Sequence, residues 1–214
     1  MKNKIIIQIL ILLIFPSISG AIQTCRNESE IPSSTLDLLY IDNGNGTITD
    51  INKGLMWHKC PLGYSGPDCL IKIGANKYNL QDALYEAENN LHGGYNDWRL
   101  PNIKELQSLV EIRCYEPAIN LNLFPNTPGS IGSNFFSSSM SKVSIGYSHI
   151  VNFRYGRSMV ALNTELNYVR FVRNNTSTYN LEISVEQEIT QTDPTTTDLA
   201  KFEVIFSSEI INRK

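Results

Sequence analysis

Four cysteines constrain this chain more than any other feature of its sequence. In an oxidising compartment an even number of cysteines indicates disulfides, and four of them allow three pairings. Cys60 and Cys69 are close in sequence, which favours a local bridge between them and leaves Cys25 to tie the N-terminal region to Cys114. Zinc is the competing interpretation, but the spacings match no zinc pattern and no pair of histidines lies beside them. We therefore expect two disulfides and no metal site.

The N-terminal residues indicate that the chain is exported. Lys2 and Lys4 precede an apolar stretch at residues 5–15, and small residues follow up to Ala21. This is the order of a secretory signal peptide with cleavage after Ala21. An uncleaved membrane anchor is the alternative, but about 11 apolar residues are few against the roughly 20 that span a bilayer. We expect residues 1–21 to be removed, no membrane span in the mature chain, and a secreted protein that is periplasmic, extracellular or at the cell surface.

Charge is distributed unevenly along the chain. The whole sequence carries a formal net charge of −3, which does not favour nucleic acid as a partner. Between residues 142 and 173, however, the sequence has one acidic residue, Glu165, and five basic residues: Lys142, Arg154, Arg157, Arg170 and Arg173. Ordinary surface scatter is one interpretation of this segment, and a basic face that attracts polyanions is the other.

Residues 36–60 have the pattern of a β-meander. Residues 38–41 are apolar and β-prone, and two Asn-Gly steps at 43–46 supply the positive φ angles of a hairpin turn. Residues 47–49 alternate as a returning strand does, and 55–57 form another apolar run. A calcium loop is the alternative for the turn, but the spacing and the terminal glutamate of such a loop are missing.

Helical patterns follow the meander. In the first, Asn79 is the expected N-cap and apolar residues recur at helical spacing: Leu80, Ala83, Leu84, Ala87 and Leu91. A second helix is expected after Pro101, where Asn102 and Glu105 form a capping box. Its apolar stripe consists of Ile103, Leu106 and Val110.

From residue 134 onward the pattern returns to strands. Residues 150–153 and 159–162 flank a turn at 154–156, and residues 168–173 alternate apolar and basic side chains. The order of strands, two helices and strands predicts an α+β fold with antiparallel sheets.

Several segments resemble the Lcl C-terminal domain family. The most specific is Gly-Tyr-Asn-Asp-Trp-Arg-Leu-Pro-Asn at residues 94–102. Others lie at 42–50, 54–57, 103–106, 117–120, 137–139, 151–153 and 169–173. The resemblance covers roughly residues 25–173, and we place the domain at 22–173. It implies a C-type-lectin-like fold and a place at the bacterial exterior, and members of the family often carry the same cysteine pattern.

Departures from the family pattern limit what the resemblance implies. Phe136 stands where tryptophan is usual, and Phe171 where a cysteine is common. The signatures of calcium-dependent lectins are missing, so calcium-mediated sugar binding is not expected. Adhesion through sulfated polysaccharides is the functional idea attached to the family, but the adhesin that named it also has a collagen-like stalk. This chain has no Gly-X-Y repeat.

The C-terminal segment, residues 174–214, carries a second resemblance. Residues 181–187 and 200–207 are similar to the first strands of a bacterial Ig-like surface repeat. Such a sandwich needs about seven strands, so the segment is expected to be either the start of a longer chain or a pair of strands that packs elsewhere.

No catalytic constellation emerges from the sequence. His58, His92 and His149 belong to no local motif, and the serines at 137–139 lack a nucleophile elbow. We expect a non-enzymatic protein without a cofactor, in which Trp98 and Leu100 pack in the core; a sugar platform is the alternative for Trp98.

Two functional hypotheses remain. The first is a binding module for sulfated or acidic polysaccharides that uses Arg154, Arg157 and Arg170. Strand alternation puts Arg170 and Arg173 on opposite faces, so both cannot join one patch. The second is a structural or protein-interaction module of a bacterial surface assembly, whose partner is another surface protein.

Overall fold

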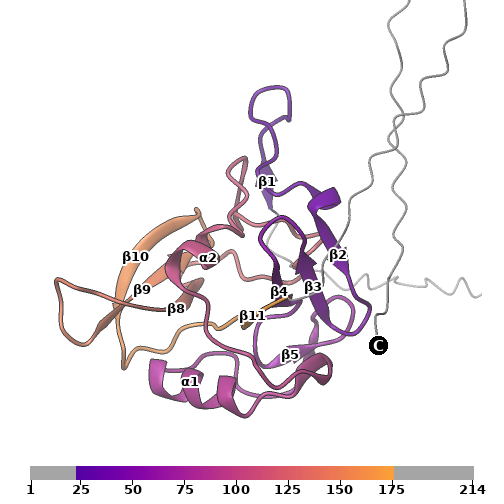
Figure 1. Ribbon diagram of the computed structural model, residues 1–214. Helices are drawn as coiled ribbons and strands as arrows, with labels where there is room; N and C mark the ends of the chain where they lie inside the picture. Colours follow the sequence, from indigo (N-terminus) through magenta and orange to yellow (C-terminus); the bar gives the residue numbers. More distant parts are fainter. Residues whose placement is uncertain (1–22, 176–214) are drawn as a thin grey trace, which may run out of the picture.

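The computed structural model describes residues 23–175, and we interpret those residues alone (Figure 1). The predicted signal peptide and nearly all of the C-terminal segment lie outside this range. In the part that is described, no helix has the length and apolar character needed to cross a membrane.

The predicted β-meander is confirmed. It begins with a short 3-10 turn, η1 (Asp37–Leu39), followed by β2 (Tyr40–Asp42), β3 (Thr47–Asp50) and β4 (Leu55–His58). These strands pair antiparallel, and β11 (Val172–Asn174) joins β4 to complete the order β11-β4-β3-β2. Gly44 and Gly46 have φ angles of 73° and 83°, which explains the two Asn-Gly steps in the β2–β3 turn.

A second antiparallel sheet is built from β8 (Asn134–Met140), β9 (Tyr147–Asn152) and β10 (Arg157–Leu162), in the order β10-β9-β8. Its register shifts between Phe136 and Met140, where β8 is irregular. Successive side chains of a strand point to opposite faces of its sheet. In the central part of this sheet, the side chains on both faces are buried. Phe135 and Val151 belong to one apolar cluster, whereas Phe136 and Ile150 belong to the other.

Short strand pairs carry the disulfides. β1 (Thr24–Cys25) pairs with β7 (Cys114–Tyr115), and the Cys25–Cys114 disulfide joins directly opposed residues. β5 (Tyr64–Ser65) lies inside the loop that the Cys60–Cys69 disulfide closes, and it pairs with β6 (Ile71–Lys72), which follows that loop. These are the two pairs that closeness in sequence favours, and they leave no free cysteine in the chain.

The helices begin where the capping residues predict. The Asn79 side chain accepts from the Asp82 amide at 2.9 Å at the start of α1 (Leu80–Glu88). At α2 (Ile103–Gln107), Asn102 and Glu105 form the reciprocal capping box. The short 3-10 turn η2 (His92–Gly94) lies between them.

The apolar face of α1 is narrower than the sequence predicts. Leu80, Ala83 and Ala87 are buried, but Leu84 is 44 % exposed. The helix ends at Glu88, so Leu91 follows it and is exposed as well. Helical spacing identifies a set of candidates, and the position of the sheet below decides which of them are covered.

Trp98 and Leu100 lie in the core, as predicted. They are 4 % and 2 % exposed, and the Trp98 indole Nε1 donates to the His92 carbonyl at 3.0 Å. A buried ring cannot serve as a sugar platform, so the alternative for Trp98 is excluded.

The prediction of an alternating strand at residues 168–173 is wrong for residues 168–171. Regular strand structure is limited to β11, and Val169, Arg170, Phe171 and Val172 are all completely buried. The reason is that this segment crosses the middle of the domain. The Tyr168 carbonyl accepts from the Phe136 amide, and the Phe171 carbonyl accepts from the His58 amide. With neighbours on both sides, the segment has no solvent face.

We predict that Leu80→Ala costs about 2–4 kcal/mol of the free energy of unfolding, because it opens a cavity under α1. The matched variant Leu84→Ala should cost less than about 1 kcal/mol, since that side chain already contacts water. Urea unfolding of both variants measures the difference. Equal losses would mean that α1 packs through the broader stripe.

Candidate functional site

Arg170 does not belong to a surface site, which corrects the predicted three-arginine patch. Its side chain is completely buried, where its guanidinium donates to the carbonyl oxygens of His58 and Lys59 and, at 2.8 Å, to Thr127 Oγ1. The guanidinium carbon lies 4.8 Å from the centre of the Phe124 ring. Burial lowers the pKa of Arg170 to about 9, so the group remains a cation at neutral pH.

Arg154 and Arg157, by contrast, lie together at the surface. They flank the turn between β9 and β10, which we call the Tyr155 turn (residues 154–157). The guanidinium carbons lie 4.9 Å (Arg154) and 5.7 Å (Arg157) from the centre of the Tyr155 ring, which is 47 % exposed. Gly156 permits the turn: its φ is 69°, and a Cβ there would lie 2.5 Å from Val110 Cγ1.

The two arginines of the Tyr155 turn differ in their electrostatic environment. Arg154 Nε and Nη2 donate to Glu116 Oε1 at 2.8 and 2.7 Å. Arg157 is exposed and has no carboxylate within ion-pair distance among residues 23–175. In the same described range, each of the other arginines outside the core pairs with an acid: Arg26, Arg99, Arg113, Arg154 and Arg173. Within the part of the chain that the structure describes, no carboxylate therefore compensates the charge of Arg157.

The sequence pattern indicated the two arginines but not Tyr155. The signal was present, because an aromatic residue lies between them in the same turn. Spacing alone, however, does not reveal whether such a ring points into the core or into solvent.

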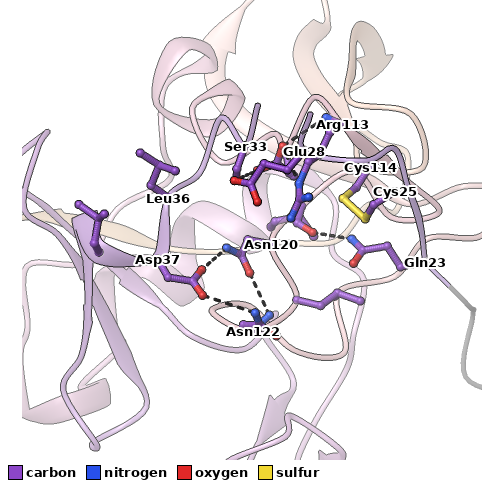
Figure 2. Close-up of a pocket in the computed structure, with 14 residues that line it drawn as sticks. Gln23, Cys25, Glu28, Ser33, Leu36, Asp37, Arg113, Cys114, Asn120 and Asn122 are labelled. Atoms are coloured by element: carbon purple, nitrogen blue, oxygen red, sulfur yellow. Dashed lines mark hydrogen bonds and ion pairs between the residues drawn. A yellow bond between two sulfur atoms is a disulfide. The ribbon is translucent and has the colours of Figure 1, made fainter. Parts of the chain in front are cut away.

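A cleft of about 420 Å³ lies elsewhere, beside the Cys25–Cys114 disulfide (Figure 2). Its walls are an N-terminal segment at residues 23–38 and a central segment at residues 111–122. Figure 2 shows Asp37, Asn120 and Asn122 joined by hydrogen bonds across it, with Asn120 Nδ2 donating to Asp37 Oδ1 at 2.5 Å. Glu28, Asp37 and Glu111 line this cleft together with Arg113, so its charge does not suit a polyanion.

Glu111 holds the two walls of the cleft together. Its carboxylate is 2 % exposed and accepts from Ser33 Oγ at 2.7 Å, Thr35 Oγ1 at 2.6 Å and the Thr35 amide at 3.0 Å. Burial by itself raises the pKa of Glu111, but the hydrogen bonds from Thr35, Ser33, Ser34 and Arg113 prevail and lower it to about 2. A carboxylate so strongly stabilised is a structural anchor and a poor general base at neutral pH.

The side chains of His58 and His92 pack against each other and against aromatic rings of the core. Their ring centres are 4.3 Å apart, and His58 contacts Trp98 and Phe171 edge to face. Burial, together with His92 and Arg170, lowers the pKa of His58 well below its ordinary value of 6.5, so its ring is neutral. No group of three metal-ligating side chains occurs in the described range.

We predict that Arg170→Met lowers the free energy of unfolding by at least about 2 kcal/mol, because it leaves buried oxygen acceptors without a donor. Arg157→Met removes the same charge at an exposed position and should stay within about 0.5 kcal/mol of the parent. Urea unfolding compares the two. A neutral Arg170→Met variant would show that the core repacks without the guanidinium.

A second prediction concerns pH. The folded-state pKa of Glu111 lies below the ordinary value of 4.5, so the unfolded chain takes up its proton first. The stabilisation by this carboxylate is therefore complete above pH 4.5 and is lost as pH falls towards 2. The stability gap between the parent and Glu111→Gln should narrow over this range.

Unfolding at several pH values measures that gap. Glu28→Gln, at an exposed carboxylate on the same cleft, is the control and should follow the parent at every pH. A gap for Glu111→Gln that does not change with pH would contradict the prediction.

Comparison with known proteins identifies the family of the chain. A family model, the Lcl C-terminal domain, matches residues 46–173, from the β2–β3 turn through both helices into β11. A search of curated proteins found no match. The matched range is more than half of the chain and contains the Tyr155 turn, while the cleft wall at residues 23–38 precedes it. The chain therefore belongs to the Lcl C-terminal domain family.

Proposed function

We propose that the protein is a non-enzymatic binding module of the cell exterior that contacts sulfated or acidic polysaccharides through the Tyr155 turn. The observation that carries this proposal is the exposed Tyr155 ring beside Arg157, a guanidinium without a carboxylate partner in the described range. A sugar ring stacks its apolar face on an aromatic ring, and sulfate or carboxylate groups match the planar fork of arginine. Both kinds of contact are therefore available at one turn.

The role of Arg154 follows from its contact with Glu116. A guanidinium already held by a carboxylate adds little net charge, so Arg154 orients Tyr155 and Arg157 supplies the attraction. One free cation at an exposed site binds weakly and is screened by salt. The proposal therefore describes low-affinity contact with a polymer that offers many acidic groups.

The proposed location at the cell exterior agrees with the chemistry of the chain. Disulfides persist in oxidising compartments, and all four cysteines are paired here. The membership in the Lcl C-terminal domain family supports a surface-associated domain. We also propose a C-type-lectin-like architecture, supported by α1 and α2 beside antiparallel sheets and by the disulfide between β1 and β7.

A structural or protein-interaction module remains the second candidate. Large apolar side chains project from the β8–β9 turn, where Val143 is 95 % exposed and Ile145 is fully exposed. Neighbouring exposed apolar side chains often mark a contact surface, whereas single ones are common on any protein.

For the first candidate we predict that the full chain is retained on immobilised heparin at low salt and released as salt rises. Arg157→Ser should weaken binding about fivefold, which corresponds to about 1 kcal/mol for an exposed charged contact. Tyr155→Ser should weaken it as well, because the stacking surface is lost.

The matched control is Arg26→Ser, which removes one positive charge from an exposed arginine far from the turn in sequence. Equal effects of Arg157→Ser and Arg26→Ser would show that only net charge matters. If the parent is not retained at all, the polysaccharide proposal fails and the protein-interaction module is favoured.

A further inference from the structure

The strand β10 forms a sheet edge with an apolar sequence. It pairs with β9 on one side, and within residues 23–175 no strand pairs with its other side (Figure 1). Residues 157–160 are exposed one after another, with Met159 at 50 % and Val160 at 44 %. Natural edge strands are usually blunted by lysine, proline, a bulge or an inward charge. From Ser158 to Leu162 β10 has no lysine, proline or charged residue, and the register shift of this sheet lies in β8.

The hydrogen-bond pattern shows which backbone groups of β10 face outward. Arg157 lies opposite Asn152, and the same register brings Asn163 opposite Gly146, whose carbonyl accepts from the Asn163 amide at 2.8 Å. Along an antiparallel pair, residues alternate between those that bond to the partner strand and those that do not. Residues 157, 159 and 161 therefore bond to β9, whereas the N–H and C=O groups of Ser158, Val160 and Leu162 point away from it.

This alternation restricts how a second strand can pair with the edge. Outward-facing residues must lie opposite outward-facing residues, so the antiparallel pairing of two β10 strands that uses their whole length has its two-fold axis at Val160. Val160 then exchanges both backbone bonds with Val160 of the second copy. In each copy, the Leu162 amide donates to the Ser158 carbonyl of the other copy. The Leu162 carbonyl already accepts from the Glu165 amide, so we do not count it as an acceptor for the Ser158 amide of the other copy.

The side chains match in the same register. Val160 packs against its own copy, and Met159 lies opposite Ala161. Arg157 lies opposite Asn163 and not opposite a second arginine, so the pairing places no like charges together. Both the backbone groups and the side chains of β10 are thus complementary to themselves.

We propose that β10 is a self-association edge, through which two copies of this chain pair antiparallel about a two-fold axis at Val160 and form one continuous sheet. The occupant is a second copy because the edge is self-complementary in hydrogen bonds and apolar contacts, and because residues 158–162 carry no charge that would repel their own copy. This inference is independent of the polysaccharide proposal, since it does not use Tyr155 or the charge of Arg157.

Cysteine substitutions test the register directly in the full chain. Its own cysteines are all paired, so a new cysteine is the reactive thiol. In the proposed dimer the two Val160 Cα atoms are about 5.5 Å apart, within the range that a disulfide spans. The two Ser158 residues are about 13 Å apart, because each lies four residues along the strand from the other. Under mild oxidation Val160→Cys should form a covalent dimer, and Ser158→Cys should remain a monomer on a non-reducing gel.

Sedimentation of the unmodified chain and of Val160→Lys provides the second measurement. The parent should sediment as a dimer, and Val160→Lys as a folded monomer with an unchanged circular dichroism spectrum, because two lysines would face each other across the axis. Equal cross-linking of the two cysteine variants, or a monomeric parent, would overturn the proposal. A monomeric parent whose Val160 amide is protected from hydrogen exchange would assign the edge to residues 176–214 instead.

Discussion

The Arg170 guanidinium lies where three distant stretches of the chain meet. It donates to the carbonyl groups at the end of β4, bonds Thr127 and stacks on Phe124 in the loop before β8, while its own backbone crosses the middle of the domain. A buried cation is costly unless its donors are satisfied, so the geometry of all three stretches is coupled to this one side chain. The crossing segment leads into β11, which pairs with β4, and its Tyr168 forms backbone hydrogen bonds with Asn134 and Phe136 at the start of β8.

The β8–β10 sheet is held by buried side chains at its centre, and within residues 23–175 no strand pairs with its outer edge at β10. The two features on which our proposals rest both lie at that edge. The Tyr155 turn precedes β10, and Gly156 allows the chain to reverse closely against Val110. The pairing of Arg154 with Glu116 leaves Arg157 as the cation that faces solvent.

The two proposals have a joint consequence. In a dimer paired through β10, the two Arg157 residues lie six residues apart along the paired strands, or about 20 Å. Two weak sites at a fixed distance bind a repeating polymer much more strongly than one, since the second contact is intramolecular. Self-association would therefore compensate for the single free guanidinium of each Tyr155 turn. The acidic cleft beside the Cys25–Cys114 disulfide does not take part in this, because its carboxylates repel such a ligand.

Local features of this protein were predictable from its sequence because their causes are local. The capping box at Asn102, the β2–β3 turn and the Cys60–Cys69 disulfide depend on residues a few positions apart, and each was found as predicted. The burial of Arg170, the exposure of Leu84 and the isolation of Arg157 were decided by the tertiary structure alone. Whether a charged or apolar side chain meets solvent depends on which distant segment packs over it, and periodicity within one strand or helix carries no information about that segment.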